Sequence, residues 1–502
     1  MEREVKNETM PGVDLISPDY IIHARQQFIA ENELQCFVDY CTRPLRKSIR
    51  VNTLKISVDE LIDRFNHYGL SLKSIPWCSQ GFWVEHGADP KYGISDIHAN
   101  LEQEISLGNM LEHLQGLFYI QEASSMLPPI ALLQTLLPDK SVTILDLAAA
   151  PGSKTTQLAA LINNDGLILA NEKSASRVKI LHSNLVRCGI SNTCISQFDG
   201  NKLKERLSNY FDYVLLDAPC GGEGTVRKDP TALKNWNLEK VLEIAGLQKQ
   251  LILTAYNCLK PGGRLVYSTC TLSKEENHQV AQFLLNSTNA KVEMLDQLFA
   301  GADKSITVEG FLHVLPQTYD SEGFFVAAFT KPVDADAQLA DVQQDSPFYK
   351  PEKKILQRIQ NYYFEHFGLE LSLLNKSILQ RDREVWLFPM GFENVSSRVR
   401  LNRSGIKLAD IYPNKIRSSH EFAISYGSRC QCEKINLSVS ETEEYLMGRN
   451  LSISQQGSLS DGEVLLIANG FPIGLGSLQK GKIKNLLPRS RVVDNITLEP
   501  RT

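Results

Sequence analysis

Between residues 117 and 330, short apolar runs alternate with longer segments of helical periodicity. Five apolar runs predict strands, at residues 142–148, 166–172, 193–200, 211–220 and 263–270. Helical spacing predicts helices at residues 154–163, 174–189, 239–259 and 274–286. We expect Pro261-Gly262-Gly263 to end the third of these helices. Strands that alternate with helices predict an α/β fold, a parallel sheet with helices on both faces. Residues 323–329 predict a late strand at its edge.

The segments before this region mix strand and helix patterns. Residues 1–20 predict a loose arm, and residues 49–55 predict a strand. Residues 58–69 have helical spacing and stop at Gly69. A further helix is expected within residues 100–114. The sequence therefore predicts a small N-terminal α+β subdomain over residues 1–115, followed by an α/β domain over residues 116–331.

The C-terminal third begins with a linker. Residues 332–350 contain few large apolar residues and four Asp, which is typical of a linker. Residues 351–394 are expected to form a connecting segment that is mainly helical. Residues 395–502 are rich in turns and strands, and residues 462–478 predict a hairpin with Gly-marked bends, as in a small β-barrel.

The composition is that of an ordinary globular protein, with 42% hydrophobic and 22% charged residues in 502. No run of 18 apolar residues is present and the first residues lack an apolar signal, so we expect neither a membrane span nor secretion. Ten cysteines in a chain of this length indicate a reduced, cytoplasmic setting rather than a disulfide framework. Cys430 and Cys432 have no second pair nearby, so no metal site is predicted.

The charge is unevenly distributed along the chain. The net charge is −5, but residues 395–502 carry 15 Lys and Arg against 10 Asp and Glu. That segment has a net charge of +5, and the rest of the chain carries −10. A second basic cluster lies between Arg43 and Arg50. Local basic patches rather than the global sum decide phosphate contact, so nucleic-acid binding stays open.

A turn of small residues follows the first predicted strand of the α/β domain. In an open α/β sheet, ligands lie beyond the carboxyl ends of the strands, and small residues let a ligand approach the backbone. Three other strands end in an acid, at Glu172, Asp199 and Asp217. A P-loop is excluded because Leu147 stands where its first Gly is required, and no G-x-G-x-x-G is present.

A row of acids suits a ligand with hydroxyls, an amine and a positive charge, such as S-adenosyl-L-methionine. We expect Glu172 to accept from the ribose and Asp199 from the adenine amine. The alternative is that these acids only cap the elements that follow them. The turn expected to hold the methionine end consists of Ala148, Ala149, Ala150, Pro151, Gly152, Ser153 and Lys154.

Two cysteines follow neighbouring strands, Cys220 in "DAPC" and Cys270 in "YSTC". A thiolate is a soft nucleophile that can add to C6 of a pyrimidine. This addition makes C5 able to attack the methyl group of a sulfonium. One cysteine suffices to start the reaction and a second could help to end it. The alternative is that each is a small buried apolar residue.

Several motifs resemble those of the Nol/Nop/Sun family of RNA cytosine-C5 methyltransferases. They are "LDLAAAPGSKT", "LLDAPCGGEGTVRKDP", "GGRLVYSTCT", "PLRKSIRVNTLK" and "GLFYIQEASSMLP". The resemblance covers the whole chain, including a tail similar to a PUA-type RNA-binding module. It implies a Rossmann-like class I methyltransferase domain between an N-terminal α+β subdomain and a PUA-like domain.

The resemblance also implies roles for individual residues. Cys270 would be the nucleophile and Cys220 would assist release of the product. Asp217 would hold the N3 and N4 edge of the cytosine, and Lys154 would lie near both cofactor and base. The positions from Ala148 to Lys154, with Glu172, Asp199 and Asp217, would bind S-adenosyl-L-methionine. Gly221 departs from the family pattern, which has a serine there.

The expected substrate is RNA, held by basic residues around the reaction centre. Arg46 and Arg50 in the N-terminal cluster, and Arg227 and Lys228 in the loop after Cys220, are the expected RNA contacts. Trp236 could stack on a base or pack in the core. The leading hypothesis is a monomeric 5-methylcytosine-forming enzyme that acts on 16S rRNA of the small ribosomal subunit. A tRNA target, a non-catalytic RNA-binding assembly factor and a protein or small-molecule methyltransferase are the alternatives.

Overall fold

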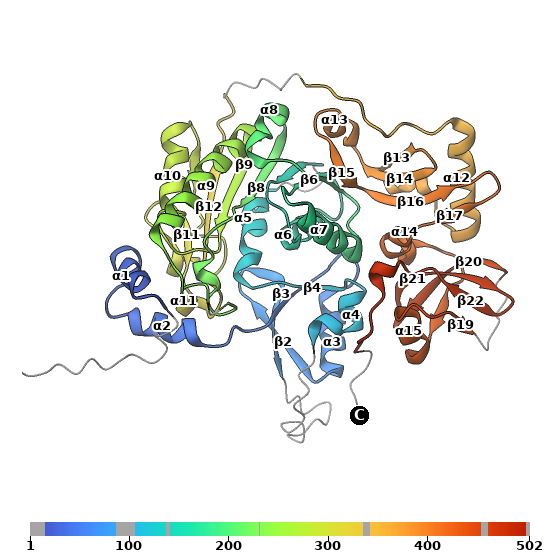
Figure 1. Ribbon diagram of the computed structural model, residues 1–502, viewed down its shortest axis with the longest axis horizontal. Helices are drawn as coiled ribbons and strands as arrows, with labels where there is room; N and C mark the ends of the chain where they lie inside the picture. The colour runs from blue at the N-terminus through green and yellow to red at the C-terminus, as the bar shows by residue number, and fades with distance from the viewer. Residues whose placement is uncertain are drawn as a thin grey trace, which may run out of the picture.

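A computed structural model of the chain describes residues 16–86, 106–136, 141–229, 231–334, 342–452 and 460–497. Figure 1 shows three parts side by side. A large central sheet is flanked by helices on both faces. The residues before it in the chain form a small sheet, and the residues after it, here called the C-terminal half, form two further sheets. The expected α/β fold with N-terminal and PUA-like C-terminal parts is confirmed.

The large sheet has nine strands in the order β10-β12-β9-β8-β5-β6-β7-β15, with β11 paired to β12. Strands β5 to β9 are mutually parallel, as the sequence predicts. Their bounds are β5 Thr143–Asp146, β6 Leu167–Asn171, β7 Thr193–Ser196, β8 Phe211–Asp217 and β9 Leu259–Thr269. The antiparallel strands are β10 Lys291–Glu293, β11 Leu312–Val314, β12 Phe324–Thr330 and β15 Leu401–Ser404.

Alternating residues of the parallel strands pack into two separate cores, one on each face of the sheet. Ile144 of β5 points to a core with α5, α6 and α7, whereas the adjacent Leu145 points to a core with α8, α9 and α10. The period of two along a strand explains this division. The helices are α5 Leu127–Leu133, α6 Ser153–Leu161, α7 Ala175–Cys188, α8 Lys204–Leu207, α9 Leu238–Cys258 and α10 His278–Ser287.

One prediction about the position of a strand in this sheet was wrong. Residues 323–329 were expected at an edge, but β12 is paired with β9 on one side and with β10 and β11 on the other. The long helix, expected over residues 239–259, ends at Cys258 as predicted, and Pro261-Gly262-Gly263 lie within β9, which begins at Leu259 rather than at residue 263. The pairing of β8 with β9 shifts register there, so the strand accommodates the three residues as an irregularity.

The N-terminal part divides into a sheet and a pair of helices. The sheet has the order β2-β3-β1-β4, formed by β1 Ser48–Val51, β2 Leu70–Ile75, β3 Cys78–His86 and β4 Phe118–Ile120. Helix α3 (Val58–His67) packs on it and α4 (Leu111–Leu114) precedes β4. Helices α1 (Pro18–Gln27) and α2 (Leu34–Thr42) lie instead beside α11 (Pro316–Tyr319) of the central domain. Residues 1–15 of the expected arm and residues 100–105 of the expected helix lie outside the described residues.

The C-terminal half contains two more sheets (Figure 1). The first has the order β13-β14-β16-β17, from β13 Lys376–Arg381, β14 Glu384–Pro389, β16 Ile406–Ile411 and β17 Ile416–Ser418. The segment expected to be mainly helical over residues 351–394 therefore holds α12 (Lys353–Phe367), the two strands β13 and β14, and α13 (Phe392–Ser396). This sheet continues across the expected boundary at residue 395, because β16 pairs with β14.

The last sheet has the order β18-β20-β21-β22-β19 and packs on α15 (Val439–Leu446). Its strands are β18 Ile435–Leu437, β19 Leu451–Ser452, β20 Gly462–Ala468, β21 Phe471–Gln479 and β22 Lys482–Asn485. The predicted hairpin over residues 462–478 is formed by β20 and β21. Helix α14 (His420–Tyr426) lies between the two C-terminal sheets.

Within the described ranges, no helix combines the length and apolar character that crossing a membrane requires. The same ranges contain no cluster of three or more His, Cys, Asp or Glu side chains arranged to hold a metal ion.

Candidate active site

The turn between β5 and α6 brings backbone close to the carboxyl edge of the sheet. Gly152 precedes α6 with φ of +105°, a left-handed conformation that glycine adopts readily. The amide of Ala149 donates to the carbonyl of Asn171 at 2.8 Å, and the Asn171 side chain donates to the carbonyl of Leu147 at 3.1 Å. These bonds hold the turn against the end of β6, where small side chains leave the backbone accessible to a ligand.

Two of the predicted acids lie at the ends of the next two strands. Glu172, 4% exposed, accepts from the amide of Ser174 at 2.8 Å and pairs with Arg177 at 3.3 Å. Asp199 accepts from Lys173 at 3.1 Å and caps a short 3-10 turn through the amide of Asn201. The hydrogen bond from Lys173 lowers the pKa of Asp199, so this carboxyl is ionised at neutral pH. Both acids therefore act as local caps, and both lie along the edge where the sequence placed the cofactor.

Asp146, at the end of β5, is a buried acid that the sequence analysis did not include in the site. Its Oδ2 accepts from the Thr155 hydroxyl at 2.6 Å, and its Oδ1 has no partner among the described residues. Burial raises the pKa of Asp146 to about 7. A buried acceptor without a partner beside the small-residue turn fits a ligand that carries a donor, such as an amine.

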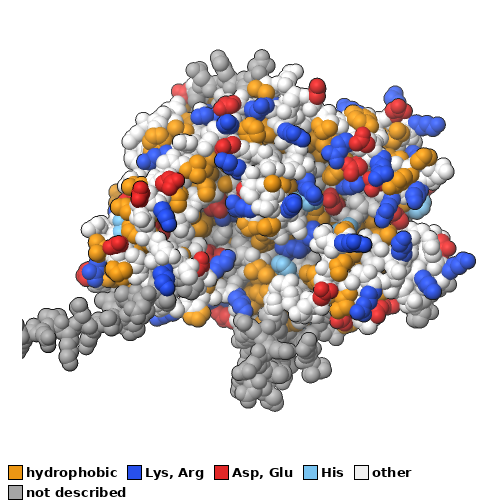
Figure 2. Space-filling model, in the orientation of Figure 1, with side chains coloured by type: hydrophobic (Ala, Val, Ile, Leu, Met, Phe, Trp, Pro, Cys, Tyr) orange, Lys and Arg blue, Asp and Glu red, His pale blue; other side chains and the backbone are white. Residues whose placement is uncertain are grey.

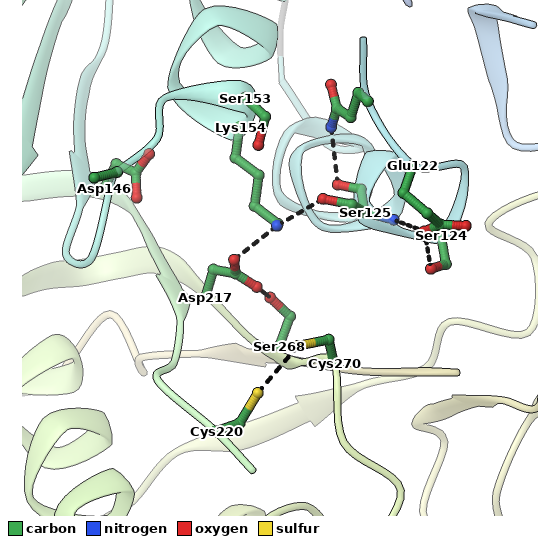
Figure 3. A network of polar contacts seen from close by, with 12 residues as sticks. Glu122, Ser124, Ser125, Asp146, Ser153, Lys154, Asp217, Cys220, Ser268 and Cys270 are labelled. Carbon is green, nitrogen blue, oxygen red and sulfur yellow. Dashed lines mark hydrogen bonds and ion pairs between the residues drawn. The ribbon is translucent and has the colours of Figure 1, made fainter. Parts of the chain in front are cut away.

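Lys154 and Asp217 lie in contact at the centre of the edge (Figure 3). The Lys154 amine donates to Asp217 Oδ2 at 2.7 Å and to the Ser125 hydroxyl at 2.8 Å. Ser268, at the end of β9, donates to Asp217 Oδ1 at 2.8 Å. Both oxygens of Asp217 are thus oriented by neighbours, and about 30% of the side chain remains exposed to receive a substrate.

The two motif cysteines also meet at this edge (Figure 3). Cys220 follows β8 and Cys270 follows β9, and their sulfur atoms are 3.2 Å apart. The hydrogen bond to Cys270 raises the pKa of the Cys220 thiol well above its usual value, and burial acts in the same direction. Cys220 is therefore held as a thiol that can donate to the Cys270 sulfur. The structure brings together the four residues expected to be catalytic, Cys270, Cys220, Asp217 and Lys154.

Two acids outside the predicted site connect the loop after β8, which carries Cys220, to the loop after β9, which carries Cys270. We call these the two cysteine loops. Glu223, three residues after Cys220, accepts from the amides of Leu272 and Ser273 at 3.0 and 2.8 Å. Glu276 accepts in the other direction, from the amide of Gly221 at 3.0 Å. Each loop therefore supplies a carboxylate to the backbone of the other, which fixes their separation.

Glu276 belongs to a run of three residues, "EEN", whose side chains each make a different bond. Glu275 accepts from Gln27 of α1 at 2.6 Å. Asn277 donates to the carbonyl of Thr271 at 3.0 Å and accepts from the Thr269 hydroxyl at 2.5 Å. The sequence shows this run as part of a motif, but its roles depend on long-range contacts that no local pattern reveals.

Two of the four expected RNA contacts are buried, which corrects the prediction. Arg50 is 3% exposed and donates to Gln121, Thr156 and the carbonyl of Ser153. Arg227 is 7% exposed, donates to the carbonyl of Pro44 at 2.8 Å and pairs with Asp320 at 2.8 Å. These guanidinium groups join segments distant in the sequence and are already occupied, so they are structural residues.

The other expected RNA contacts differ in their accessibility. Arg46 is partly exposed, pairs with Glu85 at 2.6 Å and lies over the ring of Trp83. Lys228 is exposed to solvent. Trp236 donates to Glu223 at 2.7 Å and packs against Tyr20 and His23 of α1. Trp236 therefore connects the Cys220 loop to α1, in agreement with the core-packing alternative.

Family models match four consecutive parts of the chain. Residues 18–123 match the N-terminal domain of 16S rRNA methyltransferase RsmF, and residues 133–330 match 16S rRNA methyltransferase RsmB/F. Residues 348–426 match the pre-PUA domain of ribosomal RNA small subunit methyltransferase F, and residues 432–493 match the methyltransferase RsmF PUA domain.

Relatives and solved structures agree with these matches. Ribosomal RNA small subunit methyltransferase F of Shewanella oneidensis is 45% identical over 97% of this chain and 99% of its own. The protein of the same name from Shewanella frigidimarina is 44% identical over 96% and 99%.

Two crystal structures from Pyrococcus horikoshii are similar to 63% and 64% of the chain. A methyltransferase homolog is 32% identical, with a TM-score of 0.52, over 63% of this chain and 95% of its own. NSun6, solved with SFG, is 25% identical, with a TM-score of 0.55, over 64% of this chain and 100% of its own. The resemblance seen in the motifs is thereby confirmed, and the chain belongs to the RsmB/F family of 16S rRNA methyltransferases.

Proposed function

We propose that this protein forms 5-methylcytosine in 16S rRNA of the small ribosomal subunit, through a covalent bond between Cys270 and C6 of the target cytosine. The observation that carries the proposal is the 3.2 Å separation of the two sulfur atoms, next to Asp217 and Lys154. We further propose that the enzyme works as a monomer in the cytoplasm, where the ribosomal subunit is assembled.

We propose S-adenosyl-L-methionine as the cofactor, which would supply an electrophilic methyl group. The carboxylates of Glu172 and Asp199 suit its ribose hydroxyls and adenine amine. The partnerless oxygen of Asp146 suits a donor at the methionine end, beside the turn from Ala148 to Lys154. The NSun6 structure, which is similar to 64% of this chain, was solved with SFG and supports a small-molecule ligand for this fold.

The side chains at the sheet edge account for each chemical step. The Cys270 thiolate adds to C6 as N3 takes up a proton, so that Asp217 accepts from the N3–H and N4–H edge of the ring. C5 would then take the methyl group as the bond between that methyl and the sulfonium sulfur breaks, with the electron pair staying on that sulfur, and C5 would lose its proton to a base. The C6–sulfur bond finally breaks and the electron pair returns to Cys270. The Cys220 thiol can donate a hydrogen bond to the departing sulfur, which makes Cys270 a better leaving group.

Exposed Lys and Arg side chains offer positive charge for the RNA backbone (Figure 2). Figure 2 shows a face hollowed near its middle, with Lys and Arg side chains distributed over the C-terminal half. The exposed Lys228 follows the Cys220 loop in the sequence. We propose that Lys228 and the PUA-like domain contact RNA that flanks the target, which must be extruded if it lies in a helix. Contacts of this kind weaken as salt rises.

An assay for a covalent protein–RNA adduct tests the proposal. Cys220→Ala is expected to accumulate an adduct that survives denaturing electrophoresis, because the Cys270 thiolate leaves poorly without its donor. Cys270→Ala is expected to give neither an adduct nor methylation. Cys36→Ala removes an exposed cysteine and should behave as the unmodified protein. An adduct formed by Cys270→Ala and abolished by Cys220→Ala would reverse the two roles.

A further inference from the structure

The carboxyl group of Glu276 lies between the backbones of both cysteine loops. It is fully buried, and the groups that hydrogen-bond to its two oxygens are all donors. The amide of Gly221, which follows Cys220, donates to both oxygens at 3.0 and 3.3 Å. Gln248 of α9 donates at 2.7 Å, and the hydroxyl of Thr271, which follows Cys270, donates at 3.4 Å. The Glu276 carboxylate therefore contacts the residue after each cysteine.

These contacts bind the Glu276 carboxylate more closely to the Cys220 loop than to the Cys270 loop. The backbone bond goes to the Cys220 loop, whereas the Cys270 loop contributes only the longer hydroxyl contact. Gln248 reinforces the asymmetry, because its amide also donates to the carbonyl of Pro219, next to Cys220. A negative charge bonded to the Cys220 loop stabilises the proton on the Cys220 sulfur.

We propose that Glu276 is a positioning residue that keeps the proton on Cys220 and so leaves Cys270 as the thiolate of the pair. The inference deepens the proposed function, because it explains how one of two adjacent cysteines becomes the nucleophile. The proton stays on the Cys220 sulfur and is shared with Cys270 along the 3.2 Å contact. No bond to carbon forms or breaks in this selection.

Other charged and titratable groups face the pair, and they do not give the same selection. Asp217 is the last residue of β8 and is paired with the Lys154 amine at 2.7 Å. Tyr267 donates its hydroxyl to the backbone carbonyl of Glu276. Glu223 is directed to the amides of Leu272 and Ser273. The hydrogen bond to Cys270 and burial raise the pKa of Cys220 most, and the negative charge of Glu276 raises it further. Burial raises the pKa of Glu276 to about 7, so this further contribution strengthens above neutral pH.

The departure at position 221 bears directly on this contact. A Cβ atom added at Gly221 would lie 2.8 Å from Glu276 Oε1, closer than real Cβ contacts. The family serine at this position would therefore require Glu276 to shift. In this chain, glycine lets the carboxylate approach the amide of residue 221 without obstruction.

The test measures alkylation of each cysteine by chloroacetamide as a function of pH, with peptide mass spectrometry on the full chain. It needs neither RNA nor cofactor, so its outcome is independent of whether the proposed methylation is correct. In the unmodified protein, Cys270 is expected to react at lower pH than Cys220. In Glu276→Gln, the midpoint for Cys220 is expected to fall by about one pH unit, because the nearby negative charge is gone.

Glu275→Gln is the matched control. Glu275 is the neighbouring acid and is also buried, but it contacts Gln27 and His23 of α1 rather than the Cys220 loop. We expect this variant to leave both alkylation midpoints unchanged. A Cys220 midpoint that does not move in folded Glu276→Gln overturns the proposal, and so does an equal shift in Glu275→Gln.

A second variant decides the matter if Glu276→Gln does not fold. Gly221→Ala introduces the Cβ that displaces the carboxylate while keeping every charge. It is expected to lower the Cys220 midpoint by a smaller amount. Thermal unfolding establishes that each variant is folded, and an unchanged midpoint in folded Gly221→Ala would contradict the inference.

Discussion

The Glu172 carboxylate shows how one residue can serve both the fold and a ligand. It is 4% exposed, yet the cation it pairs with, Arg177, is largely exposed on α7. The amide of Ser174 fixes one oxygen, while the other has only the 3.3 Å contact with Arg177. An acceptor held on one side and weakly satisfied on the other can accept from a ligand hydroxyl at little cost in reorganisation.

Replacing Glu172 by alanine is therefore expected to weaken binding of S-adenosyl-L-methionine by about 1–3 kcal/mol, the cost of losing a charged acceptor. Isothermal titration calorimetry on the purified chain measures this directly. Glu205→Ala, an exposed acid of α8, serves as the control and should bind normally. If Glu172→Ala binds the cofactor as tightly as the control, this residue is not part of the site.

The sequence revealed the residues at strand ends better than the residues that support them. Asp217, Cys220 and Cys270 could be placed at one edge because parallel strands end on the same side of a sheet. Glu276 and Glu223 were missed because their function depends on which loop lies opposite. Arg50 and Arg227 were misassigned for a related reason, since a basic residue shows its charge in the sequence but not the carbonyl groups that surround it.

Strand β15 is an element that no local pattern predicted. It comes from the C-terminal half and pairs antiparallel with β7, which would otherwise be the edge of the parallel strands. The amide of Gly405 donates to the carbonyl of Thr193 at 3.0 Å, and the amide of Ile195 donates to the Ser404 hydroxyl. Pairing between residues more than two hundred apart cannot be inferred from a four-residue run. It nevertheless protects the strand that leads to Asp199.

Gly405→Val is expected to disrupt this pairing. Gly405 has φ of +64°, and its Cβ would collide with the carbonyl oxygen of Leu387. Gly391→Val is a matched control, because its φ is +84° and a Cβ there meets nothing within 4 Å. Strain at positive φ is common to both variants, so the collision should destabilise Gly405→Val by a further 1–3 kcal/mol or so.

Thermal unfolding measures this difference, and hydrogen exchange locates it. Amides of residues 193–196 should exchange faster in Gly405→Val than in Gly391→Val. Equal melting temperatures and equal exchange at β7 would show that β15 contributes little to the sheet.

At the scale of the whole molecule, the C-terminal half contributes side chains to the core of the central domain in addition to forming its own sheets. Six of its residues belong to the core on the α9 face of the large sheet, namely Leu379, Trp386, Phe388, Phe392, Val395 and Val399. The sequence indicated a linker and a separate tail because composition changes at residues 332–350. Composition indicates which segments are exposed to solvent, but it does not indicate where a later segment packs in the fold.

Two shortened chains distinguish the structural part of the C-terminal half from the part proposed to bind RNA. A chain ending at residue 334 loses β15 and the six core residues, so it should expose the edge of β7 and apolar surface. We expect it to aggregate or to melt at least about 5 °C lower than the full chain, and to bind the cofactor poorly.

A chain ending at residue 431 keeps β15 and those core residues and lacks β18 to β22. It should stay folded and bind S-adenosyl-L-methionine, but it should bind rRNA more weakly, with a smaller dependence on salt. Differential scanning calorimetry and filter binding at several salt concentrations separate the two effects. A stable, cofactor-binding chain that ends at residue 334 would contradict a structural role for the C-terminal half.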